Sequence, residues 1–484
     1  MSHSTKRQAT IESRLWKSRS RRAFFHHALW LGSCLSSLLL AACNPQDTMD
    51  ESALESPIHL SQVADGWAQN AVNAVIFRKN SLVTQEQQQY IAFYSGSGEV
   101  MLGRRTLGTD DWEISASGYS GRPEDAHNSI SIMLDGAGYL HMAWDHHVDS
   151  LRYVRSTSPG SLQLGPMSTM TGQDEQAVTY PEFHRLPSGD LLFAYRDGRS
   201  GQGRMILNRY DQQSMQWTRL QDNLLDGQGE RNAYWQMHVD ASGSIHLSWV
   251  WRESSDVATN HDMHYARSDD GGVNWVDSSD QVYQLPISQD NAEIIWSIAE
   301  GSNLINQTSM TTDQSGTPYI ATYFRSSADA ATQVQMLYAE TRGSSNTGKR
   351  RWFRQEVSKR QGDFSLSGGG SKSLPISRPQ ILAQNDGDEQ WLHLIYRDSE
   401  FGDRAILASS NLTRNTNWHY TAITSDSLNR WEPSFDTELW RTHSLLHLYV
   451  QAVGQIDGEG LDESLLPSSV QVLELQLPLI TQLP

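Results

Sequence analysis

The five residues Leu140-His141-Met142-Ala143-Trp144 decide the fold, because apolar side chains occupy every second position and the segment ends in an aromatic residue. Alternation with a period of two is typical of a β-strand. The same form recurs six more times along the chain. These copies cover residues 90–94, 191–195, 245–249, 319–323, 392–396 and 445–449.

The spacing of these segments predicts a ring of repeated units. Their terminal aromatic residues are 50 to 54 residues apart in four intervals and 73 or 74 residues apart in the other two. A four-stranded antiparallel blade with its loops needs about 50 residues. Seven copies therefore predict an all-β protein, a seven-bladed β-propeller of four-stranded antiparallel blades. Glycine-containing turns at 135–138, 188–189 and 242–243 fit the hairpin between the first and second strands of a blade.

Other segments refine this prediction. The residues from Ser268 to Trp275 match the Asp-box pattern SxDxGxxW, a hairpin motif of BNR-repeat propellers. The two long intervals leave extra loop near Asp290–Asn306 and Ser365–Ser377, and we expect both loops to overhang one face of the ring. The alternating stretch from Leu465 to Pro484 is expected to close the ring against the first blade.

The N-terminus has the composition of an export signal. A basic stretch is followed by an apolar run that ends at Leu40-Ala41-Ala42-Cys43, which resembles a bacterial lipobox with Cys43 as the lipidated residue. We therefore assign residues 1–42 to a lipoprotein signal peptide, 43–57 to an acidic tether and 58–484 to the catalytic propeller. The protein is expected to be exported, and either lipid-anchored to the bacterial cell envelope (the outer membrane) or secreted. The alternatives are a plain secretory signal cut near Ala42 and a twin-arginine route through Arg21 and Arg22.

Charge and cysteine content exclude several classes of partner. The formal net charge is −18, which repels nucleic acid and anionic lipid at long range, so we expect contact with a membrane only through the lipid. The two cysteines are Cys34, inside the signal, and Cys43. The body therefore has no disulfide and no thiolate metal site. We expect it to be a monomer.

Polar residues gather where the predicted first strands begin. They are His127-Asn128, Tyr180-Pro181, Tyr234-Trp235-Gln236, Asn306-Gln307, Arg378-Pro379 and Trp431-Glu432-Pro433. The innermost strands of a propeller run in one direction, so their starts converge at one end of the central channel. A second set follows the repeated aromatics and should lie beside the first, because consecutive strands are antiparallel. That set contains Asp145-His146-His147, Arg196-Asp197, Arg252, Arg325 and Arg397-Asp398.

Structural readings compete with functional ones at these positions. His141, His246, His393 and His447 lie inside the repeated strands, where packing is the expected role. Arg196 alone would be explained by an ion pair with Asp197, and Arg397 by one with Asp398. Function therefore depends on the residues lying together, with His147 beside His127 and Arg196 beside Tyr180.

Histidine, tyrosine and arginine side chains gathered at one end of the channel suit β-elimination better than hydrolysis, because hydrolysis of glycosides usually requires a pair of Asp or Glu residues. The C5 proton of a uronic acid lies α to a carboxylate, and its removal builds negative charge that an arginine or a protonated histidine stabilises. A neutral histidine or an ionised tyrosine can take the proton, and a tyrosine or histidine can protonate the departing C4 oxygen. The chemistry requires no cofactor.

Five segments resemble those of the seven-bladed BNR-repeat ulvan lyases. They are His127-Asn128-Ser129-Ile130, Trp144-Asp145-His146-His147, Tyr180-Pro181-Glu182-Phe183, Tyr195-Arg196-Asp197-Gly198 and Asn232-Ala233-Tyr234-Trp235-Gln236. The likeness covers roughly residues 60 to 460 and is greatest to polysaccharide lyase family 25, with family 24 a near neighbour. It implies an endo-acting carbon–oxygen lyase that cleaves ulvan, a sulfated polysaccharide of rhamnose and uronic acid, and leaves unsaturated uronyl ends.

The resemblance also implies roles for individual residues. His127 and Tyr180 would transfer protons, in an order left open, and Arg196 would neutralise the uronate carboxylate. His147 and Tyr234 would support binding, with His147 preferred over His146. Arg252, Arg378 and the aromatics Trp235 and Trp431 would line sugar subsites. A structural metal ion, present in some relatives, would need histidine or carboxylate ligands here.

Two other functions fit the same group of residues at the end of the channel. A sialidase-like glycosidase would need an arginine cluster with a tyrosine–glutamate pair, and only one clear Asp box is present. A non-catalytic glycan-binding surface lipoprotein would capture the polysaccharide without cleaving it. Release of a conjugated, ultraviolet-absorbing uronyl product separates the lyase from both alternatives.

Overall fold

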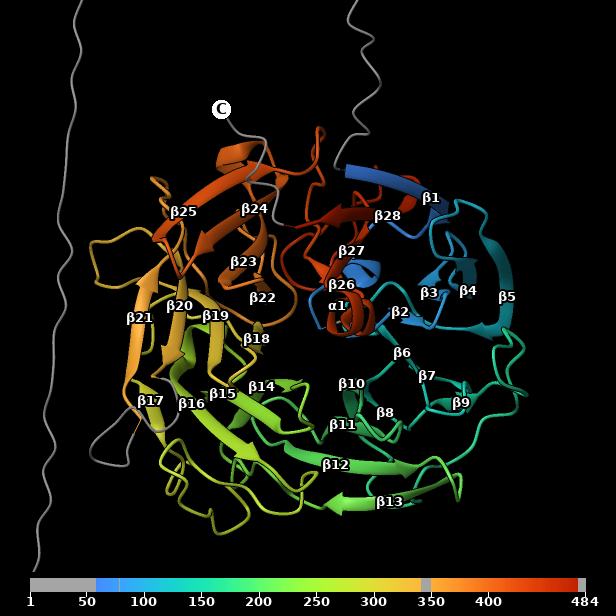
Figure 1. Cartoon of the computed structure of the whole chain (residues 1–484), viewed down its shortest axis with the longest axis horizontal. Coiled ribbons are helices and arrows are strands. Elements are labelled where there is room, and N and C mark those ends of the chain that lie inside the picture. The colour runs from blue at the N-terminus through green and yellow to red at the C-terminus, as the bar shows by residue number, and fades with distance from the viewer. Residues whose placement is uncertain (1–57, 78, 341–349, 478–484) are drawn as a thin grey trace, which may run out of the picture. The chain divides into compact units, whose positions relative to one another are not determined.

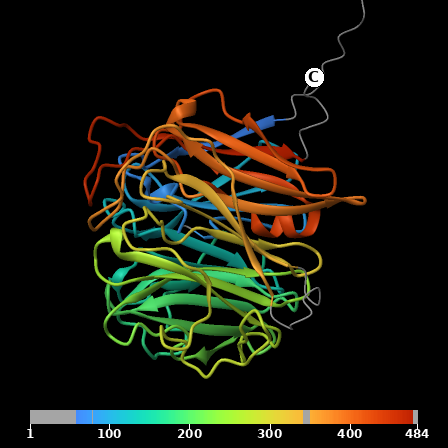
Figure 2. The same cartoon turned by 90° about the vertical axis from the view of Figure 1, so that its left-hand side faces the viewer.

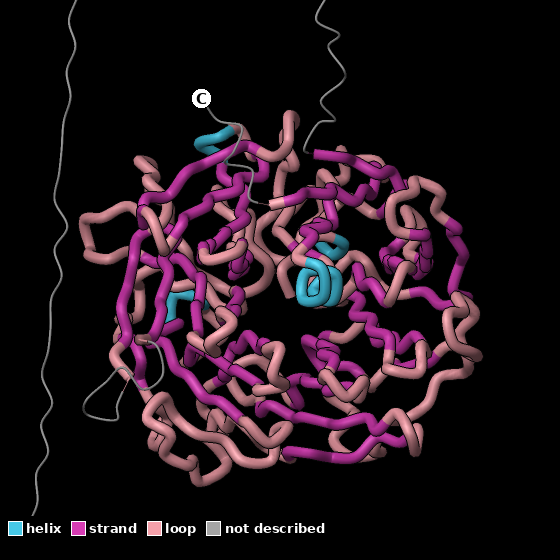
Figure 3. Tube along the Cα trace, viewed as in Figure 1, coloured by secondary structure: helices cyan, strands magenta, loops and turns pink. Residues whose placement is uncertain are grey.

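The seven repeated segments each form the second strand of a sheet, as predicted. There are seven sheets in the described residues, and Figure 1 shows the sheets arranged in a ring about one axis. Figure 3 shows how much of this body is strand. These observations come from a computed structural model, which describes residues 58–77, 79–340 and 350–477. They belong to one unit, Ser56–Pro484. The predicted signal peptide, Cys43 and tether lie outside the described residues, among which no helix is long and apolar enough to span a membrane.

The first four blades follow the chain in order. Blade 1 contains β2 (Leu82–Gln85), β3 (Gln88–Tyr94), β4 (Glu99–Thr106) and β5 (Glu113–Ser120). Blade 2 contains β6 (Ile130–Leu134), β7 (Leu140–Trp144) and β9 (Tyr153–Arg155). Blade 3 contains β10 (Val178–Arg185), β11 (Leu191–Asp197), β12 (Arg204–Asp211) and β13 (Gln216–Gln221). Blade 4 contains β14 (Asn232–Val239), β15 (Ile245–Arg252), β16 (Asn260–Ser268) and β17 (Ile294–Trp296).

The last three blades complete the ring. Blade 5 contains β18 (Ser309–Thr312), β19 (Pro318–Phe324), β20 (Gln333–Ala339) and β21 (Trp352–Glu356). Blade 6 contains β22 (Gln380–Asp386), β23 (Glu389–Asp398), β24 (Arg404–Asn411) and β25 (Asn415–Ala422). Blade 7 contains β26 (Ser434–Phe435), β27 (Leu445–Val450), β28 (Ser468–Gln476) and β1 (Ile58–Gly66).

Ring closure differs in detail from the prediction. β28 does not pair with the first blade; it lies between β27 and the N-terminal strand β1, which becomes the outermost strand of blade 7. The register runs antiparallel from Ile58 opposite Leu475 to Gly66 opposite Ser468. The two ends of the propeller sequence are therefore joined in one sheet, and residues 478–484 lie outside the described part.

Blades 2 and 7 depart from the simple pattern. Blade 2 has three strands in the described residues, and the short β8 (His147–Asp149) pairs instead with the inner edge of β10 in blade 3. In blade 7 the helix α1 (Thr437–His443) is inserted between the first two strands, and it lies over the middle of the ring in Figure 1. Figure 2 shows the blades from the side. Three single-turn 3-10 helices, at Ala71–Asn73, Val257–Thr259 and Ser399–Phe401, complete the described elements.

The repeated aromatics form the packing between blades. All seven, from Tyr94 and Trp144 to Tyr449, are at most 1% exposed. The histidines of the repeated strands are buried too, which confirms their predicted packing role. For example, His141 lies between the hydroxyl of Tyr153 at 2.8 Å and Oδ2 of Asp135 at 3.3 Å. Burial lowers the pKa of His141, so its imidazole is a neutral part of the core.

The Asp box forms the predicted hairpin after β16. Oδ1 of Asp270 accepts hydrogen bonds from the Ser268 hydroxyl and from the backbone N–H groups of Val273 and Asn274. Trp275 is fully buried and its indole N–H donates to the carbonyl of Gly272. The motif therefore fastens a turn at the periphery of blade 4 and contributes to folding.

Candidate active site

The starts of the innermost strands meet at one cleft, as the sequence predicts. It is lined by Phe77, His127, Tyr180, Asn306, Gln307, Arg378 and Glu432, each of which precedes or begins the first strand of its blade. Gly370, Ser371, Lys372, Leu374 and Ile376 cover one side, which confirms the overhang predicted for 365–377. The other predicted overhang is mostly wrong: Ile294–Trp296 is the outer strand β17, and only Ile305 and Asn306 reach the cleft.

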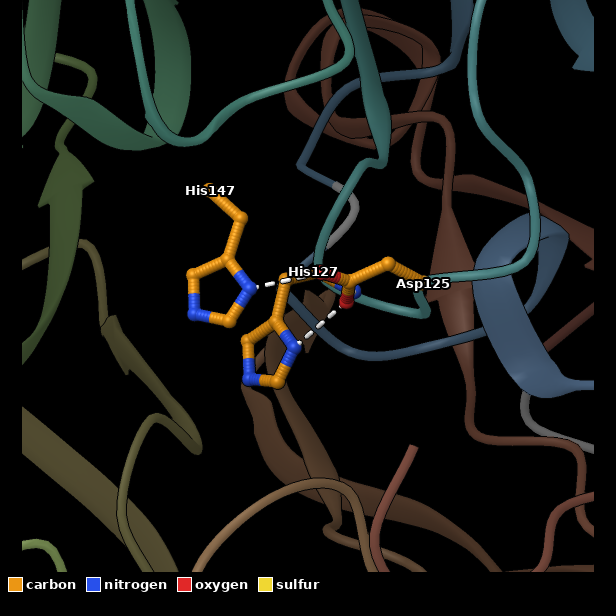
Figure 4. A group of neighbouring side chains, drawn as sticks. All are labelled: Asp125, His127 and His147. Carbon is orange, nitrogen blue, oxygen red and sulfur yellow. Dashed lines mark hydrogen bonds and ion pairs between the residues drawn. The ribbon is translucent and has the colours of Figure 1, made fainter. Parts of the chain in front are cut away.

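Two histidines share one carboxylate at the edge of this cleft. Nδ1 of His127 lies 2.8 Å from Oδ1 of Asp125, and Nδ1 of His147 lies 2.6 Å from Oδ2 of the same residue. The imidazole rings are stacked with centroids 4.1 Å apart. Figure 4 shows the other nitrogen of each ring pointing away from Asp125. Asp125 therefore fixes both rings and leaves each Nε2 available for chemistry.

This arrangement decides the charge of His127. Burial opposes the imidazolium form, but the hydrogen bond to Asp125, with Glu459 3.7 Å away, outweighs burial and raises the pKa of His127 to about 9. Burial likewise opposes ionisation of Asp125, yet its two histidine partners hold its pKa well below the usual range. His127 is therefore a cation at neutral pH.

Tyr180 reaches the cleft through a bulge in β10. The register with β11 shifts between Thr179 and Glu182, so Tyr180 and Pro181 stand outside the regular ladder. Tyr180 has φ of 56°, in the left-handed region, which is uncommon for a bulky residue and often marks a functional site. The bulge turns the phenol towards His127, with ring centroids 5.9 Å apart.

Arg196 lies directly behind this phenol and lacks the ion pair that would make it structural. Its guanidinium carbon is 5.0 Å from the ring centroid of Tyr180. Asp197 pairs with Arg204 at 3.1 Å instead of with Arg196. Nε and Nη2 of Arg196 are buried and have no hydrogen-bond partner among the described residues. A buried guanidinium with free donors is expensive, and an anionic ligand would satisfy it.

A second phenol extends this cationic cluster. The rings of Tyr180 and Tyr234 are 6.1 Å apart, and the guanidinium carbon of Arg252 lies 5.3 Å from the Tyr234 ring centroid. Burial raises the pKa of Tyr234, but Arg252 and then Arg196 outweigh it and lower that pKa to about 8. Burial and the neighbouring phenol raise the pKa of Tyr180. Two phenolates this close repel each other, so ionisation of Tyr234 opposes that of Tyr180.

Two other arginines that line the cleft already have hydrogen-bond partners. Arg378 makes a two-pronged ion pair with Glu432, at 2.9 Å from Nε to Oε1 and 2.6 Å from Nη2 to Oε2. Arg252 donates to the backbone carbonyls of Ser254 and Ser255. Both residues line the cleft and supply positive charge, but Arg196 is the guanidinium whose donors are buried and unpaired.

Several predicted contacts with substrate are wrong. His146 is fully buried and its Nε2 accepts from the backbone N–H of Arg152, so it does not reach the cleft. Trp235 and Trp431 are also buried, and their indole N–H groups donate to Glu182 and to the carbonyl of Tyr449. Arg397 lines the cleft but pairs with Asp403, and Asp398, its predicted structural partner, pairs with Arg360 instead. These side chains hold the blades together.

Sequence reasoning missed Asp125 and Phe77, and it placed Glu432 at a strand start without giving it a role. Asp125 lies two residues before His127, and an acidic residue at that distance from a candidate catalytic histidine was the available signal. Phe77 stacks against His127 with centroids 5.5 Å apart and meets Tyr180 edge-on at 5.2 Å. Nothing local in the sequence points to Phe77, because it comes from the irregular segment before β2.

Two groups of described residues bring three metal-ligating atoms within 4.8 Å of one another. One is Asp125, His127 and His147, in which both Nδ1 atoms already lie at hydrogen-bond distance from the carboxylate. The other joins His59 of β1 and Glu474 of β28, both in blade 7, to Asp110 in the loop between β4 and β5 of blade 1; His59 and Asp110 are more than half exposed. The first group needs no ion to satisfy its polar atoms.

The fold and the converging strand starts define a BNR-repeat propeller with a basic cleft. The family model described as BNR repeat-containing family member matches residues 88–360, more than half of the chain, and the chain belongs to this family. It is similar to a protein of Alteromonas sp. (strain LOR) named ulvan lyase, short isoform, with 32% identity over 271 residues. These cover 42% of the chain and 51% of that relative.

A second relative is the ulvan lyase, long isoform, of Glaciecola sp. (strain KUL10), which is 24% identical over 272 residues, or 43% of the chain and 27% of the relative. The chain thus spans about half or less of the length of these curated relatives. Among solved structures, a polysaccharide lyase named Uly1 has a TM-score of 0.61 at 15% identity, covering 87% of this chain and 99% of the other. A PL25 ulvan lyase bound to -[GlcA(1-4)Rha3S]- has a TM-score of 0.60 at 12% identity, covering 81% and 93%. These likenesses confirm the propeller fold.

Proposed function

We propose that the protein is a polysaccharide lyase that cleaves ulvan by β-elimination and acts within the chain of its substrate. The observation that carries the proposal is the buried, unpaired guanidinium of Arg196 directly behind Tyr180, whose phenol lines the cleft together with the His127 imidazolium. A uronate carboxylate is the ligand that would pair with this guanidinium. The similarity to two curated ulvan lyases supports the choice of polysaccharide.

The charges of the cleft suggest a division of labour. Arg196 and the His127 cation would face the uronate carboxylate and stabilise the negative charge that develops when C5 loses its proton. Tyr180 lines the cleft, so it would take that proton in its ionised form, and the neighbouring Arg196 favours this phenolate. His127, already protonated, would donate to the departing C4 oxygen. The C4–O bond breaks, a C4–C5 double bond forms, and no atom beyond the substrate and these side chains takes part.

The decisive experiment is incubation of the purified protein with ulvan while ultraviolet absorbance is recorded. The expected result is a steady rise from the conjugated double bond of the unsaturated uronyl ends, with a rapid fall in viscosity because cleavage is internal. Tight binding of ulvan with no rise in absorbance would instead establish a glycan-binding protein. Release of reducing sugars with no rise would establish a hydrolase.

The activity is expected to have a narrow alkaline optimum. The rate should rise with pH as the Tyr180 phenol ionises, because only the phenolate can accept the C5 proton and its pKa is raised by burial. It should fall again as His127 loses its proton, because a raised pKa of about 9 keeps the imidazolium form below that pH and removes it above. Initial rates on ulvan between pH 6 and 10.5 measure both limbs. A flat profile across this range would contradict the assigned charges.

Replacing Asp125 with Asn should move only the alkaline limb of that profile. The variant keeps a polar group at the same place but loses the negative charge that supports the His127 cation, so the pKa of His127 falls. We expect the falling limb to shift to lower pH and the maximal rate to drop about tenfold. The same change at Asp190, which pairs with Arg209 away from the cleft, should leave the profile in place.

The location of the protein and its assembly are part of the proposal. The lipobox motif supports an exported lipoprotein held at the cell envelope through Cys43, and the acidic surface supports a monomer that meets the membrane only through its lipid. Replacing Cys43 with Ser is expected to move the protein from the membrane fraction to the soluble exported fraction. Equal amounts of wild type and variant in the membrane fraction would contradict lipidation at Cys43.

A further inference from the structure

A second cavity lies at the opposite end of the channel, where the innermost strands finish. His184 and Arg185 end β10, His238 and Val239 end β14, and Thr312 ends β18, and all five line it. One wall is helix α1 with the turn after it, through Thr437, Glu438, Trp440, Arg441 and Ser444. The cavity encloses about 1460 Å³, its opening included, against about 690 Å³ for the cleft at the strand starts. Nothing in the proposed elimination uses this space.

Arg185 brings an incompletely paired positive charge into this cavity. Its side chain is 18% exposed, and its one ion pair among the described residues is a long one, 3.9 Å from Nη1 to Oε2 of Glu438. Glu438 is held more closely by Arg441, which lies one turn further along α1. The donors of Arg185 therefore remain mostly free while burial weakens their hydration.

Two histidines beside Arg185 also lack close partners. Nε2 of His184 is buried with no hydrogen bond among the described residues, and the nearest acidic oxygen, on Glu182, is 3.7 Å away. His238 makes one long contact, 3.4 Å from Nε2 to the Thr312 hydroxyl. Burial lowers the pKa of His238 to about 3, so it offers a neutral ring that can donate one hydrogen bond.

The acidic groups of the cavity do not balance these donors. Oδ1 of Asp313 already accepts from Ser315 and Thr317 in its own turn. Its Oδ2 accepts from Nε2 of Gln390 at 2.8 Å. With Glu438 engaged by Arg441, no carboxylate among the lining residues is available to satisfy Arg185 at close range. The cavity therefore has a surplus of donors, which an oxyanion would complete.

We propose that this cavity is a second binding site for an acidic sugar, which Arg185 holds through a carboxylate or sulfate oxyanion. His184 and His238 line the same cavity and would donate to other oxygens of the sugar. The amides of Gln314 and Asn385 and the ring of Trp440 suit the hydroxyl groups and apolar face of a pyranose. The choice of a sugar as the carrier of the oxyanion rests on the proposed function, whereas the oxyanion itself rests on the free donors of the cavity.

The test separates this site from the cleft by removing the guanidinium of the cleft first. In an Arg196→Met protein, isothermal titration with sodium glucuronate, sodium sulfate and neutral rhamnose is expected to show one saturable site for glucuronate, sulfate or both. Adding Arg185→Gln should weaken that binding at least tenfold. Arg185→Lys keeps the charge and should retain part of the affinity, and Arg209→Gln, on the outer part of blade 3, should change nothing.

The outcomes decide the proposal without depending on catalysis. Binding to glucuronate alone identifies a carboxylate site, and binding to sulfate alone identifies a sulfate site. Equal binding with and without Arg185, equally tight binding of rhamnose, or no saturable binding in any titration would overturn it. Arg185→Gln by itself should cleave ulvan at the normal rate, so a failure of the elimination assay in all variants would reject the proposed function and leave the binding result standing.

Discussion

Replacing Tyr180 with Phe is expected to lower kcat on ulvan by a factor of about 10³ or more, because proton transfer by a positioned side chain contributes roughly 10² to 10⁴ in rate. The ring remains to pack against Phe77 and under Arg196, so the cleft keeps its shape. The phenol oxygen makes no hydrogen bond within the described residues, and its loss should cost little stability. Steady-state rates and a thermal melt measure the two effects.

Tyr139 provides the matched control for this substitution. It lies in the turn before β7, at the other end of the channel, with its ring 4.7 Å from the guanidinium carbon of Arg155. Tyr139→Phe should cleave ulvan like the wild type. If Tyr180→Phe kept more than a tenth of the wild-type rate, Tyr180 could not be the proton acceptor.

Replacing Arg196 with Met is expected to lower the activity while leaving the thermal stability unchanged or higher. Loss of the group facing the uronate carboxylate is expected to lower kcat/KM by about 10²- to 10³-fold, the usual effect of removing one charge-stabilising donor. The same change removes a buried guanidinium with unpaired nitrogens, and each such group costs about 1–3 kcal/mol. We therefore expect a melting temperature equal to or above that of the wild type.

The control for Arg196 is Arg209→Met, in the same blade. Arg209 forms an ion pair with Asp190 and is more than a third exposed, so its loss should change stability by less than about 1 kcal/mol and leave activity intact. An Arg196→Met protein that melts several degrees lower and loses activity only in proportion to its folded fraction would show that Arg196 is structural.

The sequence predicts the architecture well because a propeller repeats one local pattern. Strand alternation and a terminal aromatic locate all seven second strands, and antiparallel pairing places His147 beside His127. The direction of single side chains is harder to predict, because it depends on the parity of each strand. Tyr234 and Trp235 are neighbours on β14 and must point to opposite faces, so only Tyr234 faces the ring of Tyr180.

Irregular backbone accounts for most of the remaining errors. The bulge at Tyr180 breaks the parity of β10. The left-handed turn at Asp145, with φ of 64°, precedes His146, which is buried in the blade, and His147, which stacks on His127. Asp125 lies in the loop between β5 and β6, so no alternating strand pattern predicts its position. These positions are set by tertiary packing, and the strain they store is typical of functional sites.

The pairing of β1 with β28 has a consequence for how the chain reaches its native state. Strands that are about 400 residues apart in the sequence must find each other before the last sheet is complete, and contacts of such high sequence separation are slow to form. A nascent chain that lacks its final strand leaves the edges of β27 and β1 unpaired and open to aggregation. Closure of the ring therefore waits until β28 is available, and deleting this single strand should be as damaging as deleting a complete blade.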